Sequence, residues 1–165
     1  MNRSVMKKII MILMAMFAFG LQNVSAQDAP LKIVTNHPDF KIKVKRCAAS
    51  GKTVVLDLIL NNEGTNDVKI DMVVVDAWSE AYDNEGNIYQ GNDLKVKVAN
   101  KPDYNGRYYD FMIPTGVPMR LSIQINNVST SAESIARFSL CIDCSAWGLN
   151  SQKLVKFSNI PITRD

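Results

Sequence analysis

The chain has 165 residues, 47% of them hydrophobic and 21% charged, with 19 basic and 16 acidic residues. Residues 1–26 hold three of the basic residues, Arg3, Lys7 and Lys8, and no acidic one, so residues 27–165 carry 16 residues of each sign. Nucleic acids and anionic membranes need a surplus of Lys and Arg on one face of their partner. This even balance therefore excludes an electrostatic argument that the protein binds nucleic acids or anionic membranes.

The first 26 residues have the three-part plan of a secretory signal peptide. A basic start is followed by an almost wholly apolar run, Ile9 to Leu21, and by the small residues Val24-Ser25-Ala26 before Gln27. The run is shorter than the about 20 residues that a membrane-spanning helix needs. We therefore expect cleavage, no stable membrane insertion afterwards, and export to the periplasm, the cell surface or the exterior.

The remaining residues suffice for one domain with its own core. We divide them into a lead-in segment, residues 27–38, and a domain, residues 39–165. Within the domain, the segment Thr53–Asn62 has Val or Leu at every second position from 54 to 60. This alternation predicts a strand with one fully buried face. Val55 and Ile59 make the other face largely apolar as well, so we predict a central strand.

Phe40–Cys47 precedes this segment across a short turn, which predicts a hairpin, with its lysines on a solvated face. The later predicted strands lie near Val68–Val74, Trp78–Tyr82, Asn87–Gln90, Leu94–Val98, Tyr108–Ile113, Leu121–Ile125, Phe138–Ile142 and Leu154–Ile162. Short alternating strands separated by turns predict an all-β, immunoglobulin-like antiparallel β-sandwich of about seven to nine strands. A closed barrel is the alternative. Lysines at 41, 43, 95 and 97 suit the protection of sheet edges.

Short turn and strand-end motifs recur along the chain. They are Ala26-Gln27, Asn61-Asn62, Asp83-x-x-Gly86-x-x-Tyr89, Ile113–Pro118 and Phe157–Ile162. Together they resemble small secreted bacterial domains of unknown function that are related to the immunoprotective extracellular protein family. The resemblance covers most of residues 40–162. It implies an immunoglobulin-like module in the periplasm or on the cell surface, with no catalytic residues to carry over.

Three cysteines, Cys47, Cys141 and Cys144, are candidates for disulfide formation in an oxidising compartment. Three arrangements stay open: a bridge from Cys47 to one of the other two, a bridge between Cys141 and Cys144, or no bridge. The spacing of Cys141 and Cys144 matches redox motifs. Such motifs, however, place the first Cys at a helix N-terminus, whereas this pair follows a strand pattern.

Metal and catalytic signals are weak. His37 is the single histidine and is predicted to be a solvated loop residue, which argues against zinc and against nucleophiles that require a histidine base. Asp83, Glu85 and Asn87 have the alternate spacing of a calcium loop. Gly86 falls too early for that loop, and turn chemistry explains these residues. We therefore predict no enzyme, metal or cofactor.

Aromatic residues supply the candidate ligand contacts. All Tyr and Trp residues lie beyond residue 77, and Trp78, Tyr104 and Tyr108 lie near predicted loops. Aromatic rings with a polar tip suit contacts with proteins or glycans. We predict a secreted, non-enzymatic binding or structural module of the bacterial cell envelope with a protein partner. The alternatives are a carbohydrate-binding module that uses these aromatics, and a thiol-redox protein that uses Cys141 and Cys144.

Overall fold

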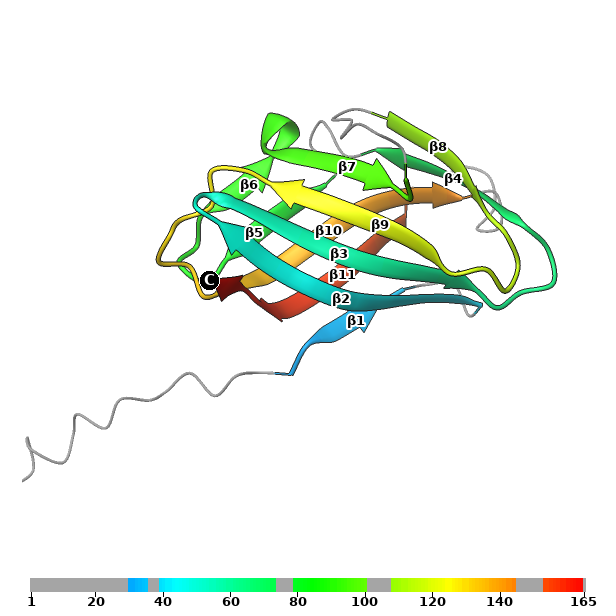
Figure 1. Ribbon diagram of the computed structural model, residues 1–165, viewed down its shortest axis with the longest axis horizontal. Coiled ribbons are helices and arrows are strands. Elements are labelled where there is room, and N and C mark those ends of the chain that lie inside the picture. Colours follow the sequence, from blue (N-terminus) through cyan, green and yellow to red (C-terminus); the bar gives the residue numbers. More distant parts are fainter. Residues whose placement is uncertain (1–29, 36–38, 74–78, 101–107, 145–152, 165) are drawn as a thin grey trace, which may run out of the picture.

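The computed structural model describes residues 30–35, 39–73, 79–100, 108–144 and 153–164. This part of the chain forms two β-sheets that pack face to face (Figure 1). The predicted all-β, immunoglobulin-like sandwich is confirmed. The described residues form twelve strands rather than seven to nine. Two of the twelve lie outside the ten predicted segments and have only three and two residues, too few to show an alternating pattern.

The larger sheet has seven strands. They are β1 (Lys32–Val34), β4 (Val68–Val73), β5 (Glu80–Asp83), β6 (Ile88–Gln90), β8 (Tyr108–Ile113), β10 (Ser134–Cys144) and β11 (Lys153–Pro161). Their order is β1-β11-β10-β4-β8, and all pairs are antiparallel. On the side away from β11, the first half of β10 pairs with β5 and the last four residues of β10 pair with β4. β6 then pairs with β5.

The smaller sheet has five strands and contains the predicted central strand. They are β2 (Phe40–Ser50), β3 (Thr53–Asn62), β7 (Leu94–Val98), β9 (Met119–Ile125) and β12 (Thr163–Arg164). The order is β12-β2-β3-β9-β7, in which β12 and β2 are parallel and the other pairs antiparallel. β3 therefore has the predicted bounds and central position. A 3-10 turn, η1 (Gly91–Asp93), precedes β7.

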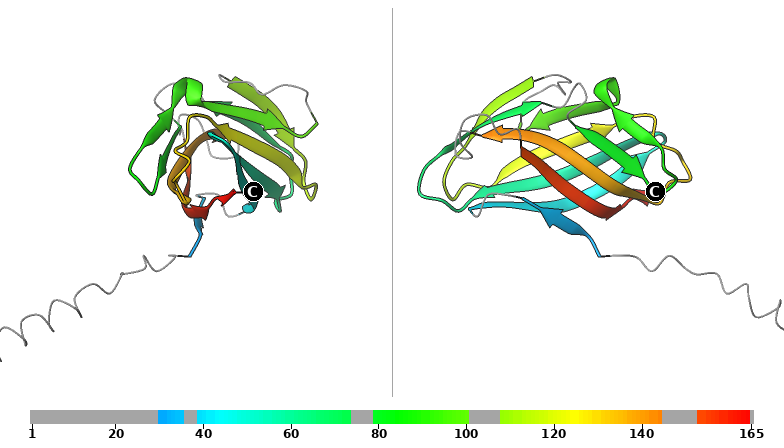
Figure 2. Two further views of the ribbon diagram at one scale, coloured as in Figure 1. Left: turned by 60° about the vertical axis from the view of Figure 1, so that its left-hand side comes forward. Right: turned by 180° about the vertical axis from the view of Figure 1, so that it is seen from behind.

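The core lies between the two sheets, which form separate layers in the left view of Figure 2. From the smaller sheet, Val54, Leu56, Leu58 and Leu60 are fully buried. From the larger sheet, the rings of Phe138 and Phe157 stack with their centroids 5.6 Å apart. Each buried aliphatic side chain contributes about 1.5–3 kcal/mol to stability, so β3 holds much of the sandwich together.

A β-bulge interrupts the alternation of β2. The pairing register with β3 shifts between Val44 and Arg46, and Lys45 is the extra residue. Before the bulge, Phe40 and Ile42 face the core, but after it Cys47 does. The bulge therefore turns Arg46 to the outer face of the sheet, which strict alternation would not have done.

The predicted lead-in segment contributes an edge strand, because Ile33 in β1 pairs with Phe157 in β11. Residues 1–26, with the predicted signal peptide, lie outside the described residues, as does His37. In the part of the chain that the structure describes, no helix is long and apolar enough to cross a membrane.

Candidate ligand-binding site

The structure does not test the three aromatic residues predicted to contact a ligand. Trp78 and Tyr104 lie outside the described residues. The backbone of Tyr108 begins β8 and pairs with Val73 in β4. The described residues present a pocket elsewhere, where loops meet at one end of the sandwich.

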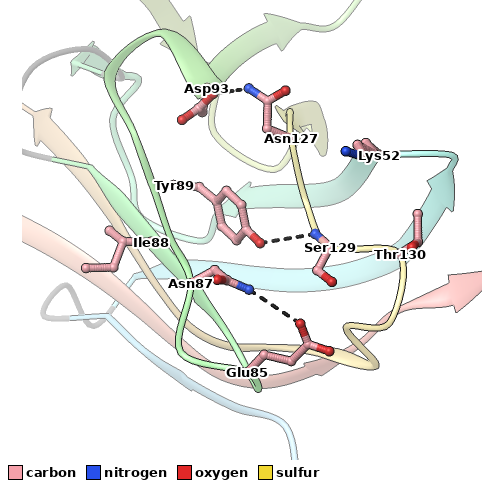
Figure 3. Close-up of a pocket in the computed structure, with 9 residues that line it drawn as sticks. All are labelled: Lys52, Glu85, Asn87, Ile88, Tyr89, Asp93, Asn127, Ser129 and Thr130. Carbon is pink, nitrogen blue, oxygen red and sulfur yellow. Dashed lines mark hydrogen bonds between the residues drawn. The ribbon is translucent and has the colours of Figure 1, made fainter.

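This end pocket has a volume of about 600 Å³. It lies where the β2–β3 turn, the β5–β6 turn, η1 and the β9–β10 connection come together (Figure 3). The lining residues are Lys52, Glu85, Asn87, Ile88, Tyr89, Asp93, Asn127, Ser129 and Thr130. Loops carried by a rigid sandwich are common positions for binding sites.

Asp83 organises the β5–β6 turn beneath the pocket. Its Oδ1 accepts hydrogen bonds from the backbone N–H groups of Glu85 and Asn87, both at 2.9 Å. Its Oδ2 accepts from Asn87 Nδ2 at 2.9 Å. Gly86 has φ +87°, which is the conformation that its place late in the turn requires. Burial of Asp83 favours a higher pKa, but these bonds and one from Tyr89 outweigh burial and lower its pKa.

Tyr89 joins this turn to the other side of the pocket. Only 4% of the residue is exposed, and its hydroxyl donates to Asp83 Oδ2 at 2.6 Å. The same hydroxyl oxygen accepts from the backbone N–H of Ser129 at 3.2 Å (Figure 3). Burial and the hydrogen bond to Asp83 raise the pKa of Tyr89 to about 12. The hydroxyl therefore keeps its proton at neutral pH and acts as a fixed link.

Hydrogen bonds to neighbouring loops hold the β9–β10 connection, residues 126–133. The N–H of Asn126 donates to the carbonyl of Asp93 at 2.8 Å, and the N–H of Val128 donates to the carbonyl of Lys52 at 2.9 Å. Asn127 has φ +61°, a conformation that Asn tolerates better than most residues. Its side-chain amide donates to Asp93 Oδ1 at 2.6 Å.

Arg164 in β12 braces the same loops from the end of the chain. Its guanidinium donates to the carbonyl oxygens of Ser129 at 2.7 Å, Ala132 at 3.0 Å and Gly51 at 3.3 Å. A planar group with five donors suits this task. The two turns that border the pocket are thus tied to a strand of the sandwich, so the pocket is preformed.

The pocket rim keeps several polar groups open to solvent. Lys52, Glu85 and Thr130 are exposed, and 54% of Ile88 is exposed. Figure 3 shows Asn87 and Ile88 on one side of the pocket and Lys52 and Thr130 on the other. Ammonium, carboxylate, amide and hydroxyl groups therefore converge on one space, which can bind a polar ligand by hydrogen bonds.

The calcium-like spacing of Asp83, Glu85 and Asn87 has a structural explanation in this turn. Protein donors, two of them backbone N–H groups, already occupy both carboxylate oxygens of Asp83. A cation would have to displace these bonds. Among the described residues, no group of three or more His, Cys, Asp or Glu side chains could hold a metal ion.

The cysteines lie away from the pocket. Cys47 in β2 is a buried free thiol that faces the core. Cys141 is buried in β10, but it alternates with the core residue Leu140 and lies outside the core cluster, so it does not face Cys47. β10 stays extended to Cys144, which pairs with Ile70. Residues three apart in a strand are about 10 Å apart, beyond disulfide reach.

Sequence reasoning missed most of the pocket. The Asp83-x-x-Gly86-x-x-Tyr89 motif marked one wall, although it was interpreted as turn chemistry. The polar run from Asn126 to Ser131 was a usable turn signal for the second wall. Nothing in the sequence indicated that these segments and Lys52 would meet.

Comparisons with known proteins assign no family to this chain. No protein-family model matches the chain, and no curated protein matches it. Among solved structures, a family 123 glycoside hydrolase from Clostridium perfringens, studied for glycolipid glycan hydrolysis, is similar with a TM-score of 0.38 and 10% sequence identity. The match covers 82% of this chain and 27% of that chain. The resemblance to the immunoprotective extracellular protein family therefore stays a prediction.

Proposed function

We propose that this chain is an exported, non-enzymatic binding module of the bacterial cell envelope whose ligand occupies the end pocket. The ligand class that fits best is a hydroxyl-rich group, such as the end of a glycan. The observation that carries this proposal is the polar lining of a preformed pocket of about 600 Å³.

Sugar hydroxyls both donate and accept hydrogen bonds, so a sugar site needs acceptors and donors together. The carboxylates of Glu85 and Asp93 are acceptors, the ammonium of Lys52 is a donor, and Asn127 and Thr130 can serve as both. Protein-binding hot spots are instead rich in exposed Trp, Tyr and Arg. Ile88 is the one large exposed apolar residue among the lining residues. The lining thus favours a carbohydrate ligand over a protein partner, held by polar groups other than the predicted aromatics Trp78, Tyr104 and Tyr108.

The fixed hydrogen bonds support binding rather than catalysis. General acid–base work needs a group whose proton can move near neutral pH. Asp83 has a lowered pKa and Tyr89 has a pKa of about 12, and the Asp83 carboxylate and the Tyr89 hydroxyl are hydrogen-bonded to each other in the pocket wall. The thiol-redox alternative gains no support from the extended backbone between Cys141 and Cys144.

A glycan array followed by titration calorimetry tests the proposal. We expect the purified protein to bind a subset of glycans. We expect Lys52→Ala and Thr130→Ala each to lower the affinity for the tightest-binding glycan several-fold. Lys156→Ala is the matched control, because Lys156 is exposed in β11, away from the pocket. A parent protein that binds no glycan, or an equal loss in the control, contradicts the proposal.

A further inference from the structure

The outer face of the five-stranded sheet is strongly basic. This sheet is the nearer layer in Figure 1. Its core-facing residues include Ile42 in β2, Leu56 in β3 and Val96 in β7. The residues that alternate with them along each strand therefore point to solvent. The basic residues in these outward positions are Lys41, Lys43, Arg46, Lys95, Lys97 and Arg120, with exposed Lys45 at the bulge. We call this set the basic face.

The basic face has one acidic residue to balance it. In the five described strands of this sheet, Asp57 is the only Asp or Glu. The acidic residues that make residues 27–165 neutral therefore lie elsewhere in the chain. The overall balance led us to predict no basic surface, but the sheet separates the charges.

Asp57 sits at the centre of the basic face and positions two arginines. Its Oδ2 accepts from Arg46 Nη2 at 3.0 Å and from Arg120 Nη2 at 3.1 Å, and its Oδ1 accepts from Ser122 Oγ at 2.5 Å. Asp57 is almost fully buried, whereas 59% of each arginine side chain is exposed. One carboxylate thus fixes two guanidinium groups, and the pair keeps a net positive charge toward solvent.

The register spaces the charges regularly. A row across the strands runs Lys97, Ser122, Asp57, Arg46. Lys41 and Lys43 are two positions apart along β2, about 7 Å, and β7 lies three strand spacings from β2, about 15 Å. Among the described residues, Lys43, Lys45 and Lys95 have no ion-pair partner. A linear polyanion that crosses the sheet therefore meets positive groups about 7–15 Å apart.

The other side chains of the basic face indicate which kind of polyanion it can bind. Single-stranded nucleic acids are held by stacking on exposed aromatic rings, and membrane-surface segments insert large apolar groups. The outward residues of the described strands β2, β3, β7 and β9 include no aromatic ring, and the apolar residues Val55 and Ile59 are half-buried. The face offers charge and hydrogen-bond donors without either feature.

We propose that the basic face docks a linear acidic polysaccharide through the carboxylate, sulfate or phosphate groups of that polymer. This inference goes beyond the end pocket and does not depend on it. Arg46 and Arg120 supply planar donors that match oxyanions, and the lysines supply diffuse attraction along the chain. A polysaccharide is also a partner that an exported protein would meet.

The test uses a size-defined heparin oligosaccharide as the probe, at about 0.15 M salt, where interactions between distant charges are screened. The face variant is Lys43→Gln with Lys95→Gln, and the control is Lys32→Gln with Lys156→Gln, two exposed lysines of the other sheet. We expect the face variant to bind about tenfold more weakly. We also expect its slope of log Kd against log salt to fall by about 1.5, since two charge contacts are lost.

Other outcomes overturn the proposal. Equal weakening in the control variant means that net charge, rather than this face, attracts the probe. Tighter binding of the parent to phosphatidylglycerol vesicles or to single-stranded DNA than to heparin assigns the face to a different partner. Equal weakening of heparin binding by Lys52→Ala would place the probe in the end pocket rather than on the basic face.

Discussion

The hydroxyl of Tyr89 donates a 2.6 Å hydrogen bond to the buried carboxylate of Asp83, six residues earlier in the chain. The bond closes the β5–β6 hairpin, because the ring of Tyr89 is anchored in the core while Asp83 holds the turn. The hydroxyl also accepts from Ser129, so one atom links the two walls of the end pocket. A single side chain thus connects core packing to the shape of the candidate site.

Tyr89→Phe removes this hydroxyl and leaves the ring in place. Asp83 Oδ2 then loses a donor, and the N–H of Ser129 loses its acceptor. We expect the free energy of unfolding to fall by about 1–3 kcal/mol, the usual cost of unpaired buried polar groups. Urea denaturation of parent and variant measures the difference.

Tyr82→Phe is the matched control. Tyr82 is half-buried, and its hydroxyl donates to Glu80 at 3.0 Å on the outer surface, where water can replace it. We expect a loss below about 0.5 kcal/mol. Equal losses in the two variants would mean that Tyr89 contributes through its ring alone.

The stability of the protein should decline in acid because of Asp57 and Asp83. The pKa of each carboxyl is lowered: burial pushes it upward, but hydrogen bonds, and in Asp57 the charges of Arg120 and Arg46 as well, outweigh burial. Unfolded Asp has a pKa of about 3.9. The unfolded state therefore binds protons first, so this stabilisation is present above pH of about 4 and is lost as pH falls through the lower folded values.

Urea midpoints at pH 7 and at steps below pH 4 measure this effect. Asp57→Asn should flatten the acid limb, since one of the two shifted carboxyls is gone, although the variant is also less stable at pH 7. An unchanged parent midpoint down to about pH 2.5 would contradict the lowered pKa values.

The strand pattern of the sequence predicted the fold because a strand with one buried face has apolar residues at every second position. Thr53–Asn62 has the predicted bounds, and its partner β2 begins at the predicted Phe40. The bulge at Lys45 escaped prediction, since one inserted residue leaves no compositional mark, and it reverses which residues of β2 face out. Without it, Arg46 would not reach Asp57.

The two candidate sites could not be predicted for a related reason. The end pocket joins Lys52, Tyr89 and Ser129, which are far apart in the sequence and meet only through the sheet order. The basic face depends on which lysines share a surface, whereas composition counts charges without positions. The periodicity of a segment thus indicates which of its residues are buried. Strand pairing and sheet order determine which polar residues lie together on the surface.

Leu58→Ala tests the placement of the core. Leu58 is fully buried in β3, so we expect its truncation to leave a cavity and to cost about 2–5 kcal/mol. Ile59→Ala is the control from the next position on the same strand, where the side chain is half-buried on the outer face. We expect about 1 kcal/mol for the control. A smaller loss for Leu58→Ala than for Ile59→Ala would reverse the assignment of faces.

Cys47 should behave as a protected free thiol. Burial raises the pKa of its thiol to about 12, against a lowering by Arg164, so little thiolate forms near neutral pH. We expect iodoacetamide to leave Cys47 unmodified in the folded protein and to modify it fully in denaturant without reductant. Peptide mass spectrometry identifies the site, and Cys47→Ala confirms the assigned peptide. Cys47 that reacts in denaturant only after reduction would instead show a disulfide, and the free-thiol structure would be wrong at this position.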